Sequence, residues 1–286
     1  IDSDEVAEMN ERHDPSACRK ILREARENGL HRKLFDEAQD LEDGVYRAEA
    51  LCGLCASADM SEDDRSEWVP IIVDAMLEEE RAWRLAENIG IIAKSMTNWP
   101  GGRARKALMD DLIGMTGGLP HGDARVDALR AISGRVSPQK LPELFLLAVE
   151  NHGMEAKAAR PVMKAIVESK DKQMISEITT ILTESTPDLV VKFLDNLHRL
   201  SVQSKLDLEP SALEMAIPFL ESAEFETVRT LCSHITRQND VLILSQALDG
   251  NDEQSIRFAV TLAGRADRSG DSEFAVELLE KAATNV

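Results

Sequence analysis

Residues 81–89 read RAWRLAENI, and two other stretches of the chain share their pattern. Residues 47–54 read RAEALCGL, and residues 125–132 read RVDALRAI. In each stretch a basic residue is followed by small apolar residues and a leucine, at the spacing of one face of an α-helix. A pattern that recurs in this way predicts a repeated helical unit.

The rest of the chain reads as one amphipathic helix after another. Residues 188–200, for example, place Leu189, Phe193, Leu194 and Leu197 on one stripe. Strand signals are scarce, and breakers that contain glycine or proline separate stretches long enough for one or two helices. Only 4% of the residues are aromatic, so the core must consist mainly of aliphatic side chains, which suit helix-on-helix packing. The sequence therefore predicts an all-α protein.

The expected helices also recur at a loose period. If the second helix of each pair is aligned on its apolar residue, successive positions lie 28 to 44 residues apart. These positions are Leu51, Leu85, Leu129, Ile166, Leu194, Leu231 and Leu262. Such periods are typical of stacked helix pairs, none of which can bury its apolar face alone. An acidic residue lies four residues before a basic one at several places, for example at Asp43/Arg47 and Glu80/Arg84. This recurrence suggests a ladder of turns, in which the turn of one repeat is linked to the turn of the next.

Residues 68–90, WVPIIVDAMLEEERAWRLAENIG, resemble a HEAT repeat. They consist of an apolar helix that starts at a proline, a short acidic turn, and a helix that begins with arginine and carries alanine and leucine. Residues 242–264 and 30–54 are similar. The middle of the chain matches this pattern in its apolar spacing.

The resemblance, to the HEAT/armadillo type of helical repeat, covers most of residues 17–286. It implies a right-handed α-solenoid of about seven or eight HEAT-like helix pairs. We accordingly expect a single solenoid domain over residues 17–286, preceded by an acidic segment over residues 1–16 that could be mobile. The tetratricopeptide repeat has a similar period and is the alternative.

Composition limits the classes of partner. A formal net charge of −19 argues against broad contact with nucleic acid, whose phosphates would be repelled. The same charge favours basic partners, although the ordinary acidity of many proteins explains it as well.

No apolar run is long enough to span a membrane, and the start IDSDEVAEMN is unlike a secretory signal. The chain begins with Ile, so a leader could already have been removed. Four cysteines form no disulfide framework, so we expect a cytoplasmic protein.

Motifs that would carry chemistry are weak. Cys52 and Cys55 form a CxxC, but no second such pair exists to complete a zinc site, and we expect both to be structural. None of the six histidines is followed by Glu or by His four residues later. This excludes the helical zinc hydrolase motif and the paired His-Glu dipeptides of the di-iron hydroxylases built on HEAT repeats. The glycine-rich turn 117–123 lacks the ending of a phosphate-binding loop. We expect no metal, no cofactor and no catalytic residue.

The function that these observations favour is protein recognition by a scaffold whose second helices line a concave surface. With Leu85 in the core, Trp83 falls on the outward side of its helix, where an aromatic residue would be a natural binding hot spot. Packing of Trp83 against the next repeat is the competing interpretation. Helical phase predicts these contact residues: Trp83, Glu87, Lys94, Asp127, Arg130, Asp195 and Arg199.

Two other functions stay open. An enzyme on a HEAT-like scaffold could act on nucleic acid in repair, or could be a lyase that handles a prosthetic group. The basic stretches 11–33 and 103–106 could contact phosphate, although the overall charge opposes a basic concave surface. A third possibility is an assembly subunit that folds fully only within a larger complex. The partner and the oligomeric state do not follow from the sequence.

Overall fold

The computed structural model describes six stretches of the chain: residues 3–182, 185–208, 210–235, 237–245, 253–268 and 270–284. These stretches contain sixteen α-helices and no β-strand, which confirms the all-α prediction. None of the helices within them is both long and apolar enough to cross a membrane. The chain divides into two compact units, unit 1 (residues 1–154) and unit 2 (residues 155–286). The single domain expected over residues 17–286 stays a prediction.

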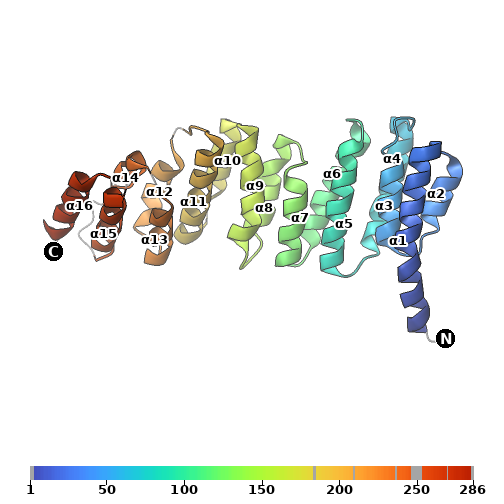
Figure 1. The fold of residues 1–286 in the computed structure, drawn as a ribbon, viewed down its shortest axis with the longest axis horizontal. Coiled ribbons are helices and arrows are strands. Elements are labelled where there is room, and N and C mark those ends of the chain that lie inside the picture. The colour runs from blue at the N-terminus through green and yellow to red at the C-terminus, as the bar shows by residue number, and fades with distance from the viewer. Residues whose placement is uncertain are drawn as a thin grey trace. The chain divides into compact units, whose positions relative to one another are not determined.

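Unit 1 contains eight α-helices in two rows. They are α1 (Ser3–Asn28), α2 (Arg32–Gln39), α3 (Gly44–Leu54), α4 (Glu62–Leu77), α5 (Ala82–Ser95), α6 (Arg103–Gly118), α7 (Asp123–Ser133) and α8 (Leu141–Val149). Helix α3 packs on α1 and α5, and α5 packs on α7, while α6 packs on α4 and α8. Odd-numbered and even-numbered helices therefore form separate rows, and the chain crosses between the rows at each turn (Figure 1).

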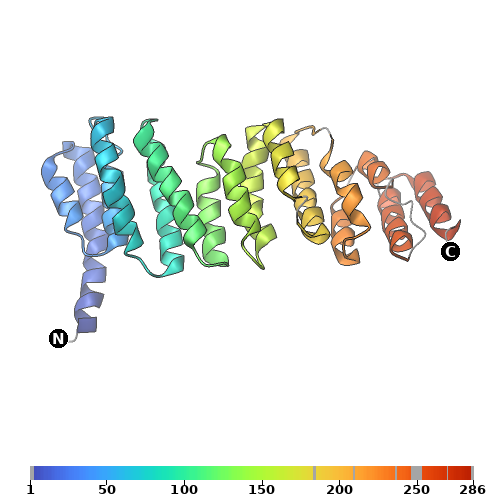
Figure 2. The ribbon, with the colours of Figure 1, turned by 180° about the vertical axis from the view of Figure 1, so that it is seen from behind.

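Unit 2 repeats this alternation. Its helices are α9 (Glu155–Ser169), α10 (Lys172–Leu182), α11 (Pro187–Ser204), α12 (Ala212–Leu220), α13 (Phe225–His234), α14 (Gln238–Ser245), α15 (Glu253–Arg268) and α16 (Ser272–Thr284). Helix α11 packs on α9 and α13, α13 packs on α15, and α12 packs on α14. Both views show the helices of each unit side by side in chain order (Figures 1 and 2). The repeat family, the handedness and the number of repeats stay predictions.

Two helix starts differ from the sequence-based expectation. Helix α1 begins at Ser3, so the described part of the segment 1–16 is helical. Helix α4 begins after Ser61, whose hydroxyl accepts a hydrogen bond from the backbone N–H of Asp64. Pro70 therefore lies inside α4 and not in its first turns, because the side-chain cap and the acidic first turn set the start of the helix.

The predicted core positions are buried with one exception. Leu51, Leu129, Ile166, Leu194, Leu231 and Leu262 are each at most 2% exposed. Leu85 is only half-buried, and Asn88, which is fully buried, lies three residues further along α5. The Asn88 amide nitrogen donates to the Val45 carbonyl over 3.0 Å. The expected full burial of Leu85 is wrong, and the burial of Asn88 was missed because apolar periodicity cannot recognise an asparagine whose burial is compensated by a hydrogen bond to another helix.

Candidate functional site

The five predicted contact residues of unit 1 lie on two neighbouring helices. Trp83, Glu87 and Lys94 belong to α5, and Asp127 and Arg130 belong to α7, which packs on α5. All five are exposed, and 61% of Trp83 is accessible to solvent. Trp83 is thus not covered by a neighbouring helix of unit 1. Whether these residues bind a partner stays a prediction.

The two predicted contact residues of unit 2 differ from this pattern. Asp195 on α11 is only 6% exposed, and His234 at the end of α13 donates to its carboxylate over 2.8 Å. The expected outward orientation of Asp195 is wrong, because α11 packs on α9, α12 and α13 and its phase alone does not reveal which faces these neighbours cover. Burial raises the pKa of Asp195, although the hydrogen bond from His234 opposes this shift. Arg199 is half-buried.

Sequence reasoning missed a buried polar stripe on the same helix. His198 and Ser201 follow Asp195 at intervals of three residues, and they are 8% and 7% exposed. Asp240 on α14 is 7% exposed, and its Oδ2 lies 3.4 Å from His198 Nε2. His198 is therefore a buried histidine that faces a carboxylate of another helix. Polar residues spaced i, i+3 and i+6 beside an apolar stripe were the available signal.

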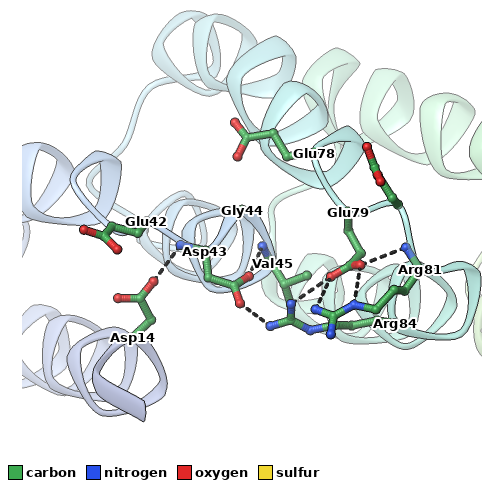
Figure 3. Close-up of a pocket in the computed structure, with 10 residues that line it drawn as sticks. Asp14, Glu42, Asp43, Gly44, Val45, Glu78, Glu79, Arg81 and Arg84 are labelled. Carbon is green, nitrogen blue, oxygen red and sulfur yellow. Dashed lines mark hydrogen bonds and ion pairs between the residues drawn. The ribbon is translucent and has the colours of Figure 1, made fainter. Parts of the chain in front are cut away.

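Trp83 lies next to an acidic pocket. The Arg81 guanidinium is 5.8 Å from the centroid of the Trp83 ring, a cation–π distance that helps to hold the indole in place. Arg81 also lines a pocket of about 400 Å³ where α1, α3 and the α4–α5 turn meet (Figure 3). The lining residues are Asp14, Glu42, Asp43, Gly44, Val45, Glu78, Glu79, Glu80, Arg81 and Arg84.

Ion pairs organise the floor of this pocket. Glu79 accepts hydrogen bonds from the Arg81 side chain (2.9 Å), from the Arg81 backbone N–H (2.8 Å) and from Arg84 (2.8 Å). Arg84 reaches from α5 across to Asp43, the N-cap of α3, as Figure 3 shows. Arg84 therefore joins consecutive turns of unit 1, and Asp14 adds α1 by accepting a hydrogen bond from the Asp43 backbone N–H over 2.6 Å.

Arg47 makes a similar bridge from α3. Its guanidinium forms two hydrogen bonds of 2.9 Å to the Glu78 carboxylate and also donates to the carbonyls of Leu41 and Glu42. The sequence pattern paired Arg47 with Asp43 within one helix. In the structure the acidic partner of Arg47 is Glu78, from the turn that follows α4, so Arg47 links two turns. The ladder of turns along the whole chain stays a prediction.

Glu79 keeps its negative charge over the physiological pH range. Burial alone would raise the pKa of Glu79, but the hydrogen bonds from Arg81 and Arg84 outweigh it and lower this pKa to about 2. The lining carries six acidic and two basic side chains. The preceding residues 59–80 add to this field, since they include nine acidic residues and one basic residue. Charge complementarity thus favours a cationic group at this pocket.

Other candidate chemistry is structural in character. Cys52 and Cys55 are fully buried, and burial raises the pKa of Cys52 to about 12, so its thiol stays protonated and unreactive. Among the described residues, no group of three or more His, Cys, Asp or Glu side chains could hold a metal ion. In the basic stretch 103–106, Arg103 is paired with Asp63 of α4. That guanidinium is therefore already engaged by a carboxylate.

Comparison with known proteins gives no family assignment. No protein family matches the chain, and no curated protein matches it either. A solved structure described as "Computational Design of Self-Assembling Cyclic Protein Homooligomers" is similar at 16% identity, over 99% of this chain and 95% of that chain. Its TM-score is 0.19, which is too low to carry an argument about fold or function. The functional conclusion therefore depends on the geometry of this chain alone.

Proposed function

We propose that this chain is a protein-interaction scaffold, and that its partner binds the surface of unit 1 formed by Trp83, Glu87, Lys94, Asp127 and Arg130. The observation that carries the proposal is the exposed indole of Trp83 at the start of α5. With 61% of its surface in water the indole is available to a partner, and tryptophan is enriched among binding hot spots.

The acidic pocket beside Trp83 supports a basic partner. Trp83 would provide the apolar anchor, while the carboxylates of the pocket would attract Lys or Arg side chains of the partner and orient its approach. Such an arrangement combines an anchor that sets the dissociation rate with charges that mainly raise the association rate.

We also infer that the helix pairs form a HEAT-like solenoid, and that the protein resides in the cytoplasm. The four free, buried cysteines support a reducing compartment.

Replacing Trp83 with alanine is expected to abolish recovery of the partner. Truncation of a tryptophan hot spot typically costs about 2 kcal/mol or more, which lowers the affinity about 30-fold. The measurement is quantitative capture of a stoichiometric protein from nuclease-treated native lysate, with the tagged full chain as bait. Because the side chain is largely exposed, the variant should unfold at the same temperature as the unchanged protein.

Leu146→Ala is the matched control, since Leu146 on α8 is also an exposed apolar residue of unit 1, at 43%. It should capture the partner normally. Equal recovery by the Trp83 variant would show that the surface is assigned wrongly. Recovery of nucleic acid, or of proteins that disappear on nuclease treatment, would instead favour the enzyme that acts on nucleic acid.

A further inference from the structure

Unit 2 contains a cavity of about 350 Å³ beside the buried polar stripe of α11. His198, Ser201 and Asp240 line its inner end, and all three are less than 10% exposed. Lys205 and Arg237, which are exposed, line its mouth. Aliphatic side chains complete the wall, namely Val202, Leu206, Leu208 and Ile243. A cavity of this size is at the lower end of the range for small-molecule sites.

The inner end contains a carboxylate whose hydrogen bonding is incomplete. Asp240 Oδ2 is buried and has no hydrogen-bond partner in the described part of the chain. His198 Nε2 lies 3.4 Å away, which is an ion-pair distance if the imidazole is protonated, but the two atoms do not form a hydrogen bond. Buried carboxylates normally accept hydrogen bonds, because the loss of hydration is otherwise uncompensated. Oδ2 of Asp240 therefore lacks a hydrogen-bond donor among the described residues, and a ligand in the cavity could provide one.

The mouth has the opposite character. Neither the Lys205 ammonium nor the Arg237 guanidinium forms an ion pair with any described residue, although both line the cavity. Lys205 ends α11 in the left-handed conformation (φ 52°), which sets the point from which its side chain extends. Asp207 also lines the cavity and offsets one of these two cations. The exposed part of the lining thus carries a net positive charge, and the buried part carries the Asp240 carboxylate.

From this distribution of charge we propose that the cavity of unit 2 binds a small zwitterion, a free amino acid or a dipeptide, with its ammonium group at Asp240 and its carboxylate at Lys205 and Arg237. The ammonium group would donate to the unpartnered Oδ2, and the aliphatic wall would contact the ligand side chain. The carboxylate would form charge-assisted hydrogen bonds at the mouth, where Arg can bind it with two parallel N–H groups. This site is independent of the protein-binding surface proposed for unit 1.

The test is calorimetric titration of the full chain with the free L-amino acids and with glycyl dipeptides as probes. At least one probe should bind, and its N-acetyl and carboxamide derivatives should each bind at least tenfold more weakly, since each derivative lacks one of the two charges. If no probe binds, or if the N-acetyl derivative binds as well as the parent compound, the proposal is overturned.

Variants locate the binding site. Asp240→Asn keeps the shape of the side chain but removes the negative charge, and it should weaken binding of the probe at least tenfold without lowering the unfolding temperature. Arg237→Gln, at an exposed position, should weaken binding by about fivefold or more and tests the same site if the Asp240 variant folds poorly. Arg229→Gln is the matched control, because Arg229 is an exposed arginine of the same unit that pairs with Glu226 and does not line the cavity. Unchanged affinity in the Asp240 and Arg237 variants would place the binding elsewhere and overturn the assignment.

Discussion

Replacing Arg84 with methionine is expected to destabilise unit 1 by about 3 kcal/mol at neutral pH, since removing one partner from a buried ion pair leaves the other charge poorly compensated. The Arg84 side chain is only 15% exposed, and it binds Glu79, at 7% exposure, and Asp43, at 11%. Methionine keeps most of the aliphatic volume, so the effect reports the lost ion pairs. Urea unfolding of the full chain measures it, followed by tryptophan fluorescence, because Trp68, Trp83 and Trp99 all lie in unit 1.

Arg103→Met is the control for this variant. Arg103 also pairs with an acidic residue of another helix, Asp63, but the two side chains are 67% and 83% exposed. Exposed ion pairs contribute at most about 1 kcal/mol, so this variant should unfold at nearly the same urea concentration as the unchanged protein. Equal destabilisation by the two substitutions would contradict a special role for the Arg84 network.

The effect of the Arg84 substitution should depend on pH. The pKa of Glu79 in the folded chain is about 2, lower than its ordinary value of 4.5. A carboxylate with a lowered pKa stabilises the folded state above its ordinary value, and this contribution disappears as the pH falls from about 4.5 to about 2. The difference in unfolding free energy between the two proteins should therefore be largest at pH 7 and should shrink steadily below pH 4.5. A difference that stays constant down to pH 2.5 would show that Glu79 is not responsible.

Replacing Gly44 with alanine should be similarly severe, and we expect a loss of about 3 kcal/mol, at the upper end for an added methyl group in a packed interior. A Cβ atom at Gly44 would lie 2.2 Å from the carbonyl oxygen of Ala75. That oxygen belongs to the backbone of α4, so the clash can be relieved only if α3 and α4 move apart. The same fluorescence-detected urea unfolding measures the loss.

Gly114→Ala provides the matched comparison. Gly114 is an exposed residue inside α6, and a Cβ atom there would meet nothing within 4 Å. Alanine should stabilise unit 1 there by about 0.5 to 1 kcal/mol, because it loses less backbone entropy in a helix than glycine does. If the Gly44 variant were as stable as the Gly114 variant, α3 and α4 could not be as close as the structure places them.

Much of the architecture could be predicted from local sequence patterns. The apolar spacing predicted the all-α class, and it placed Leu51, Leu129 and Leu262 in the core, where they are fully buried. These predictions succeed because the apolar stripe of an amphipathic helix generally faces the core. The exposure of Trp83 follows from the same argument, since it lies on the side of α5 opposite the buried Ile92.

The residues of the candidate sites could be predicted less well from the spacing of apolar residues. Asp195 was expected at the surface and Leu85 in the core, but Asp195 is buried, Leu85 is only half-buried, and Asn88 on the same helix is fully buried. In both cases a polar side chain is buried because a group from another helix, His234 or the Val45 carbonyl, satisfies it. Spacing within one helix carries no information about that partner.

The sequence by itself therefore determined the helical class of this protein, the recurrence of its helices and most of its buried aliphatic positions, because these depend on the 3.6-residue period of a single helix. Only the tertiary structure decided that Arg84 binds Asp43, 41 residues earlier, and that the oxygen of Asp240 lines a cavity without a hydrogen-bond partner. The physical reason is that ion pairs and cavities arise between helices distant in the chain, so they depend on how those helices pack, which no local pattern encodes.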